Sequence, residues 1–202
     1  GALPARRSLA PEKLIDDVVD VMNLTGWARE RFFDELSALV ARIFIGIDRN
    51  YLVADFQAPD LVSAKVLTIR SGDGALVGFN MFRMFEHEVD GRTVATFRVL
   101  AGLLPAYRGR NSVLAFSFAQ AIPYKLRHPL RQVNYLLCAN PPSSYYVVAR
   151  YAHEIWPRPE QETPVQKYSL LQKLCAACGF VIGEDGGEGG QAYVLRHGRG
   201  TI

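Results

Sequence analysis

Basic, polar and small residues of the kinds that bind anions are concentrated in one short segment, at positions 103–112. It reads Leu-Leu-Pro-Ala-Tyr-Arg-Gly-Arg-Asn-Ser and joins a strand-like pattern to a helix-like pattern. The N-terminus of a helix presents unpaired backbone N–H groups and about half a positive charge to an anion. Arg108 and Arg110 add formal charge, so the segment predicts a pyrophosphate site. The alternative is that Asn111 and Ser112 only cap a core helix while the arginines are solvated.

An antiparallel meander comes before this segment in the chain. Strand patterns run over 63–70, 75–89 and 93–104, and the two connections contain Asp73-Gly74 and Asp90-Gly91. Asp-Gly pairs favour the tight turns of β-hairpins, because glycine reaches a positive φ without strain. We therefore expect neighbouring antiparallel strands that lead into the segment.

A helix and a second strand are expected after the segment. Apolar residues at helical spacing predict a helix over 111–126, and an almost continuous apolar run predicts a buried strand over 132–138. A strand–helix–strand crossover makes that strand parallel to the strand before the helix. The other elements expected beyond it are a helix from Ser143 or Ser144 to about Ile155, a helix over 165–177 and a hairpin of 180–182 with 192–195.

Two helices are expected near the N-terminus. The first is predicted over 12–24, where Leu14, Ile15, Val18, Val19 and Met22 recur at helical spacing. The second follows Thr25, a suitable N-cap, and its apolar face consists of Phe32, Phe33, Leu36, Leu39, Val40 and Ile43. Because no repeat or long linker is evident, we expect a single domain over 1–202, with N-terminal helices and the first strand region in 1–62 and the core in 63–202.

The segment Pro105-Ala106-Tyr107-Arg108-Gly109-Arg110 resembles the pyrophosphate loop of the GNAT superfamily of acyl-CoA-dependent acyltransferases, whose usual form is Pro-x-Tyr-Arg-Gly-x-Gly-x-Gly. Asn111 and Val113 stand where that form has its two later glycines. The order of elements over 65–195 is similar as well, including Asn140 at the start of a helix and Cys178-Gly179-Phe180 before the last hairpin.

The resemblance implies an α/β (α+β) fold: a mixed, mostly antiparallel central sheet with a parallel pair splayed at the cofactor site, helices on both faces and an N-terminal helical pair. It implies that acetyl-CoA or another acyl-CoA binds in the splay. Backbone groups at Ala101 and Leu103 would bond the pantetheine arm and polarise the thioester carbonyl. The other cofactor-binding positions that it implies are Arg108, Gly109, Arg110, Asn111, Ser112, Val113 and Asn140.

In this resemblance an amine attacks the thioester directly, which requires a base and an acid. Tyr145 and Tyr146 stand where family members carry a tyrosine that can act as the acid. The alternative is that both rings pack in the core or carry a hydroxyl bonded to the backbone. No carboxylate base is evident. Alternation places Glu86 and Glu88 on one strand face and His87 on the other, beside a turn, which favours solvated charges.

The chain has three cysteines, Cys138, Cys175 and Cys178, too few and too unevenly spaced for a disulfide framework. We therefore expect a reducing compartment, the cytoplasm. Cys175 and Cys178 have redox-motif spacing, but they end a predicted helix with no neighbouring His, and we expect them on its core face. Cys138 ends a buried strand, where a nucleophile is an open alternative. No metal site is expected.

Composition and charge set the classes of partner. The chain has 202 residues, 49% apolar and 21% charged, and its longest apolar runs fall far short of a membrane span. The net charge is +3, yet no acid occurs between Gly91 and His153, where eight basic residues fall. Such an asymmetry indicates a surface for a polyanion, or a solvated face with acids nearby in space. The scatter of the basic residues fits a small phosphorylated ligand better than nucleic acid.

These observations predict an acyltransferase that moves an acetyl or acyl group from coenzyme A, or from a carrier-bound thioester, to an amine. The alternative is a non-catalytic acyl-CoA-binding or sensing domain of the same fold, suggested by the two missing glycines and the missing base. A basic nucleic-acid-binding module is the third class, and it predicts affinity that falls steeply with salt. The sequence does not define the amine acceptor.

Overall fold

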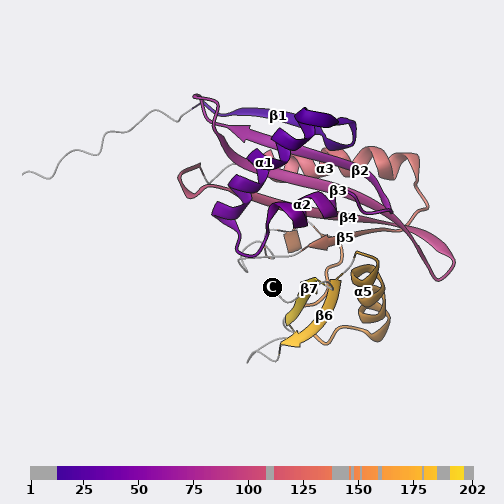
Figure 1. The fold of residues 1–202 in the computed structure, drawn as a ribbon. Helices are drawn as coiled ribbons and strands as arrows, with labels where there is room; N and C mark the ends of the chain where they lie inside the picture. Colours follow the sequence, from indigo (N-terminus) through magenta and orange to yellow (C-terminus); the bar gives the residue numbers. More distant parts are fainter. Residues whose placement is uncertain are drawn as a thin grey trace, which may run out of the picture. The chain divides into compact units, whose positions relative to one another are not determined.

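The computed structural model describes residues 13–107, 112–137, 146, 148–150, 152–158, 161–178, 180–185 and 192–197. In chain order its elements are β1 (Ile15–Asp20), the 3-10 turn η1 (Val21–Asn23), α1 (Gly26–Ile43), α2 (Arg49–Asp55), β2 (Leu61–Arg70), β3 (Leu76–Val89), β4 (Arg92–Leu103), the 3-10 turn η2 (Pro105–Tyr107), α3 (Ser112–Arg127), β5 (Val133–Leu137), α5 (Val165–Ala177), β6 (Phe180–Asp185) and β7 (Ala192–His197) (Figure 1).

The strands form one five-stranded sheet of order β1-β2-β3-β4-β5 and a separate pair, β6-β7. β1 is antiparallel to β2, whereas β4 and β5 are parallel, in a register that runs from Ala95 opposite Val133 to Val99 opposite Leu137. β6 and β7 are antiparallel. The mixed α/β architecture and the parallel pair at β4 and β5 confirm the fold predicted from the sequence.

The connection between β3 and β4 shows why the meander forms. Asp90 has a φ of 51° and Gly91 a φ of 71°, the left-handed conformations that a two-residue hairpin turn requires. Glycine reaches this region without strain, and aspartate is among the residues that tolerate it best. The expected meander of β2, β3 and β4 is confirmed, with boundaries that differ from the prediction by one or two residues.

The contacts divide the chain into two compact units. One consists of Gly1–Pro59, Ser63–Phe82 and Ala101–Ile122, and the other of Asp60–Val62, Arg83–Leu100 and Pro123–Ile202. The strands β3 and β4 therefore each contribute residues to both units.

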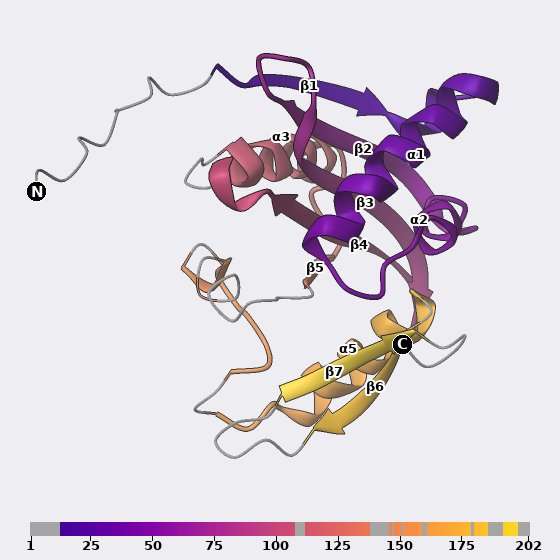
Figure 2. The same cartoon turned by 60° about the vertical axis from the view of Figure 1, so that its left-hand side comes forward.

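In the first unit, helices cover both faces of β3. Phe79 points to the α1 side, where its ring centroid lies 6.3 Å from that of Phe44 just after α1. The next residue, Asn80, points to the other side, and its side-chain amide donates to the Ser117 hydroxyl of α3 at 2.9 Å. Successive strand residues point to opposite faces, so α1 and α3 lie on opposite sides of β3 (Figures 1 and 2).

The apolar face of α1 makes the core of this unit. Phe33, Leu36, Leu39 and Val40 are buried, as the helical spacing predicts. Thr25 is the N-cap residue, although its side chain makes no capping hydrogen bond. The sequence pattern did not predict α2. This helix begins after Asp48, and the Asp48 carboxylate accepts from the Tyr51 N–H at 2.7 Å.

In the second unit, α5 packs along the β6-β7 pair (Figure 2). The expected helix over 165–177 and the expected hairpin are confirmed, with β6 beginning at Phe180. Phe180 and the fully buried Cys175 form a small core with Leu136 of β5. At the other side of the parallel pair, the Phe97 ring of β4 contacts the ring of Tyr124 edge-on, with centroids 5.6 Å apart.

The helix predicted over 12–24 is wrong, because residues 15–20 form the edge strand β1. Pairing with β2 accounts for the difference: Asp20 lies opposite Lys65, and the Asp17 carbonyl accepts from the Thr68 hydroxyl at 3.2 Å. Ile15 and Val18 remain about half exposed, whereas a core-facing helix would bury them. β-Branched residues at these positions favour the strand once a partner strand is available.

The predicted helix after Asn140 is tested only in part, because its first residues lie outside the described ones. Helical hydrogen bonds run from the Arg150 N–H to the Tyr146 carbonyl and from the Ala152 N–H to the Val148 carbonyl. Residues 152–155 are not helical, so the predicted end at Ile155 is wrong. The Glu154 carboxylate there binds Lys167 of α5 and the Trp156 indole, contacts that hold this stretch as a turn.

Among the described residues, none of the helices combines the length and the apolar character that crossing a bilayer requires.

Candidate functional site

The strand-to-helix connection singled out by the sequence has the predicted arrangement at both of its ends. β4 ends at Leu103, η2 turns the chain over Pro105–Tyr107, and α3 begins at Ser112. Arg108, Gly109, Arg110 and Asn111 lie outside the described residues. Ser112 and Val113 belong to the first turn of α3, and their side chains are not described. The loop therefore leads into the N-terminus of a 16-residue helix.

The backbone N–H and C=O groups of Ala101 and Leu103 point to the edge of β4 that pairs with β5 over residues 95–99. The Ala95 N–H donates to the Gln132 carbonyl on the β5 side at 2.9 Å, whereas the Leu104 N–H donates to Val77 of β3 at 3.0 Å. Backbone groups of successive strand residues point to alternate edges, so odd-numbered residues of β4 face the β5 edge.

The register of β4 with β5 is described as far as Val99 opposite Leu137, the last described residue of β5. Ala101 and Leu103 carry their N–H and C=O groups on the same edge, two and four residues farther along. Residues 138–145 lie outside the described residues, so the predicted splay of the two strands stays a prediction.

Two glycines allow close packing at this end of β4. A Cβ at Gly102 would lie 3.0 Å from Ile43 Cγ2 and 3.1 Å from Phe44 Cε2, at the end of α1. A Cβ at Gly78 of β3 would overlap the Leu103 side chain. Such distances are shorter than van der Waals contact, so larger residues here would displace the strand. The absence of a side chain at Gly102 therefore lets this part of β4 pack closely against Ile43 and Phe44.

Helix α3 is hydrogen-bonded to β3, on the face opposite α1. The buried Ser117 hydroxyl accepts from Asn80 of β3, while Lys125 and Arg127 lie in the last turn of the helix. Cations near the C-terminus interact favourably with the negative end of the helix dipole. The positive end of the dipole lies at Ser112. An anion next to that end would meet unpaired N–H groups.

The structure places one of the two candidate catalytic tyrosines. Tyr146 is 65% exposed, so the alternative that this ring packs in the core is wrong. Its carbonyl accepts from the Arg150 N–H at 3.2 Å, in the helical turn described above. Tyr145 and Asn140 lie outside the described residues. The structure does not assign the proton donor.

Acids do lie near the basic stretch in space. Glu86 of β3 accepts from the Tyr124 hydroxyl at 2.6 Å and from Arg131 at 2.5 Å, so the expectation of a simply solvated Glu86 is wrong. Burial, with a smaller contribution from the Glu86 carboxylate, raises the pKa of the Tyr124 hydroxyl. Glu88 is exposed and accepts from Thr93, as expected of a carboxylate beside a turn. Part of the predicted positive field is therefore neutralised within the fold.

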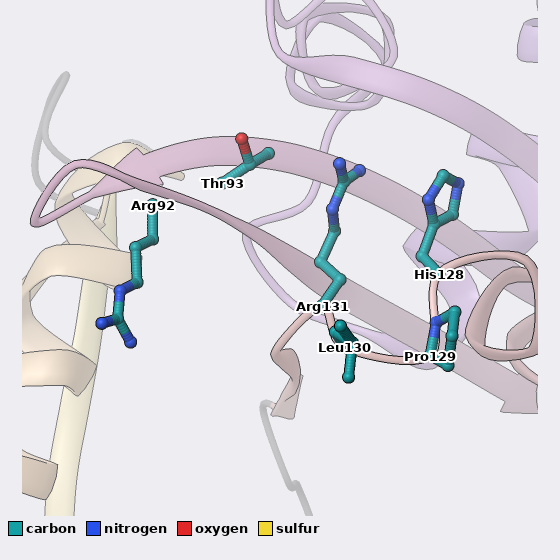
Figure 3. A pocket seen from close by; sticks show the side chains of 6 residues that line it. All are labelled: Arg92, Thr93, His128, Pro129, Leu130 and Arg131. Atoms are coloured by element: carbon teal, nitrogen blue, oxygen red, sulfur yellow. The ribbon is translucent and has the colours of Figure 1, made fainter.

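A shallow, open depression of about 480 Å³ lies beside the first residues of β4 (Figure 3). Its lining residues are Arg92, Thr93, His128, Pro129, Leu130 and Arg131. Figure 3 shows Arg131 and His128 pointing in the same direction while Arg92 points away from them. Since Arg131 is already bound to Glu86 and Arg92 points away, the two arginines do not converge on a common anion.

One cluster of three side chains was not predicted from the sequence. His87 lies between the Asp60 carboxylate, 3.1 Å from Nδ1, and the Cys178 sulfur, 3.8 Å from Nε2. The expectation that Cys178 has no neighbouring His is therefore wrong, whereas Cys175 lies in the core as predicted. The three residues are 27 and 91 positions apart along the chain, and no local pattern connects such distant positions.

No group of three or more His, Cys, Asp or Glu side chains suitable for a metal ion occurs in the part of the chain that the structure describes.

Comparison with known proteins gives structural likeness only. No protein-family model matches the chain, and no curated protein does. Among solved structures, the chain is similar to a ribosomal-protein-alanine N-acetyltransferase from Brucella melitensis biovar Abortus 2308, with 16% identity, a TM-score of 0.46, and coverage of 75% of this chain and 100% of the other.

Two further solved structures are similar over comparable lengths. The aminoglycoside N-acetyltransferase AAC(6')-Iy in complex with CoA has 15% identity and a TM-score of 0.48, covering 78% of this chain and 99% of the other. A glucosamine-6-phosphate N-acetyltransferase from Arabidopsis thaliana has 8% identity and a TM-score of 0.45, covering 76% and 100%. At such values the likeness does not establish an activity. All three similar structures are N-acetyltransferases, the class that the resemblance to the GNAT superfamily implies.

Proposed function

We propose that this protein is an acyltransferase that binds an acyl-CoA through its pantetheine and pyrophosphate and transfers the acyl group to an amine. The observation that carries the proposal is the connection from β4 to α3. A strand whose last residues turn backbone groups to its β5 edge leads through the Pro105–Arg110 motif into a helix N-terminus. This arrangement suits an extended amide-containing arm followed by a diphosphate.

The residues present fit coenzyme A in chemical type. Pantetheine contains two amides, which pair with the N–H and C=O groups of an extended strand as another strand would. The backbone N–H and C=O groups of Ala101 and Leu103 point to the β5 edge of β4 and supply such pairing groups. The N–H groups of Arg108 to Val113, with the charge of Arg108 and Arg110, would hold the pyrophosphate. Asn140 is a further cofactor-binding position that the resemblance implies.

The chemistry then requires a proton acceptor and a proton donor. The acceptor amine attacks the thioester carbonyl carbon, the developing negative charge on oxygen needs an N–H donor, and the leaving thiolate needs a proton. A backbone N–H at Ala101 or Leu103 supplies the first donor. We propose Tyr146 or Tyr145 as the acid for the thiolate, which the exposure of Tyr146 supports.

The proposal is tested by calorimetric titration with acetyl-CoA, followed by a thiol-release assay across a panel of amines. We expect saturable binding and acceptor-dependent release of one thiol per acetyl group transferred. Longer acyl-CoA donors in the same assay define the acyl chain accepted. Binding without release for any amine would leave only acyl-CoA binding, and absence of binding would contradict the proposal.

A further inference from the structure

Cys178, His87 and Asp60 form a row of interacting side chains within the second compact unit. Cys178 follows α5 directly, His87 lies near the end of β3, and Asp60 precedes β2. The sulfur is 3.8 Å from Nε2 of the imidazole, and a carboxylate oxygen is 3.1 Å from Nδ1. A thiol, an imidazole and a carboxylate in this order are the components of an activated nucleophile.

The carboxylate decides which nitrogen of His87 carries the proton. A neutral imidazole with a carboxylate at Nδ1 donates its proton there, which leaves the Nε2 lone pair to accept the thiol S–H. Asp60 is itself fixed next to β3, because its backbone carbonyl accepts from the Glu86 N–H at 3.1 Å. The His87 ring is 3% exposed and stacks on the Phe85 ring with centroids 5.8 Å apart. The base is therefore held in one orientation.

The surroundings decide the resting state of the thiol. Cys178 is the C-cap of α5, and its N–H donates to the Leu174 carbonyl at 3.0 Å. The C-terminal end of a helix disfavours an anion and favours a cation. The neutral thiol is therefore the resting form, and the proton passes to His87 during attack, as in general-base catalysis.

Charged groups around the cluster come from several elements. Arg98 of β4 is buried, with its guanidinium 5.5 Å from the Phe85 ring centroid and 4.5 Å from that of Phe180. Arg83 is buried four residues before His87 on the same face of β3. Lys173 of α5 is paired with Asp90 at 2.7 Å. The Arg98 guanidinium therefore lies against the same Phe85 ring on which His87 stacks.

We propose that Cys178 is a nucleophile that accepts an acyl group from a thioester, with His87 as its base and Asp60 as the residue that orients the base. The sulfur attacks the thioester carbonyl carbon while its proton moves to Nε2 of His87. The tetrahedral intermediate then expels the donor thiolate, which takes the proton back from His87. One sulfur–carbon bond forms and one breaks, giving S-acyl-Cys178 and a free thiol.

The thioester is the substrate class that this site fits. Exchange of an acyl group between two sulfurs nearly conserves bond energy and needs no oxidant, reductant or metal. The thiolate is also a good leaving group, so the single imidazole suffices as acid and base. Naming acyl-CoA as the donor rests on the proposed function, whereas a short thioester without a nucleotide does not require it.

The test measures the mass of the intact protein after incubation with acetyl-CoA or with the acetyl thioester of N-acetylcysteamine, and locates the added acetyl group by peptide fragmentation. We expect one acetyl group on Cys178, released by hydroxylamine. Cys178→Ser should abolish the label, and Cys175→Ser, the matched cysteine three residues earlier, should retain it. A label on Cys175 or Cys138 instead, or no label from either donor, would overturn the inference.

His87→Gln and Asp60→Asn separate the activating groups from the fold. We expect the rate of Cys178 alkylation by iodoacetamide at pH 7 to fall at least tenfold in His87→Gln, because that variant lacks the imidazole that takes the thiol proton as the sulfur attacks. Asp60 is about half exposed, so Asp60→Asn should fold normally and still lower the rate severalfold. Rates unchanged in Asp60→Asn would contradict its orienting role, and unchanged rates in both variants would overturn the inference.

The two donors distinguish this inference from the proposed function. Acetylation of Cys178 by the short thioester, in a protein that does not bind acetyl-CoA, supports the inference and contradicts the proposed function. Binding and turnover of acetyl-CoA without any label on Cys178, in either donor, support the proposed function and overturn the inference.

Discussion

The end of β4 and the His87 cluster show two ways of building a reactive site. At the end of β4 the useful groups are backbone N–H and C=O groups, and their direction follows from strand parity, as the bonds of Ala95 and Leu104 show. In the cluster the useful groups are side chains of Asp60, His87 and Cys178, which the fold brings together from distant positions. The first site therefore depends on where the strand lies, and the second on which residues are present.

This difference predicts how each region responds to substitution. At the end of β4, most side chains can change without loss, provided that the strand keeps its place. The exceptions are the glycines, where added atoms collide with Ile43, Phe44 or Leu103. In the cluster, even an isosteric change of His87 removes the chemistry.

Backbone groups at the edge of a strand cannot protonate the leaving thiolate, so the proposed reaction needs a side chain as its acid. Replacing both Tyr145 and Tyr146 with phenylalanine should lower kcat for acyl transfer about a hundredfold or more, the usual contribution of a general acid. Affinity for acetyl-CoA should stay the same, because the rings are retained. Single variants identify which tyrosine acts. Full turnover in the double variant would show that the acid lies elsewhere.

Gly102→Val should displace the end of β4. The added atoms meet Ile43 and Phe44 at about 3 Å, so we expect a loss of about 1–3 kcal/mol in the free energy of unfolding, with weaker binding of acetyl-CoA. Gly72→Val is the matched control, because a Cβ there meets only the Lys13 carbonyl, at 3.6 Å, and should cost less than about 0.5 kcal/mol. Equal losses in urea unfolding would contradict the close packing.

The smallest effect is expected at the ion pair that joins α1 to β2. Arg70 binds both carboxylate oxygens of Glu35, at 2.5 and 2.7 Å, and this bonding lowers the pKa of Glu35 below its ordinary value of 4.5. The stability it supplies is therefore complete above the ordinary pKa and is lost as the pH falls through the lowered value. Glu35→Gln should cost less than about 1 kcal/mol at pH 7, since the pair is partly exposed. The deficit should vanish at strongly acidic pH, and a constant deficit would contradict this assignment.

Sequence reasoning succeeded where the determinants are local. The strand pattern before Pro105, the Asp90-Gly91 turn and the helical spacing over 165–177 each lie within a few residues, and the structure confirms the elements they predict. It failed at residues 12–24, because pairing with β2 outweighed a helical spacing that a short strand also satisfies. That competition is between distant segments and leaves no trace in a short window.

The cluster could not be predicted for a related reason. Asp60 precedes one strand, His87 lies in the next, and Cys178 follows a helix near the end of the chain. The sequence indicates only that His87 lies on the opposite strand face from Glu86 and Glu88, because that follows from the strand period. Knowing which carboxylate and which thiol meet its two nitrogens requires the folded chain.

The most direct test of the central claim, that the N-terminus of α3 and the loop before it hold a pyrophosphate, is the dissociation constant of acetyl-CoA for Arg108→Glu measured by calorimetry. Arg92→Glu, at the opposite end of β4, makes the same change in net charge and serves as the control. We predict that Arg108→Glu weakens binding at least about fivefold, more than about 1 kcal/mol, while Arg92→Glu stays near the native value. Native affinity in a folded Arg108→Glu, or equal weakening in both variants, would contradict the claim.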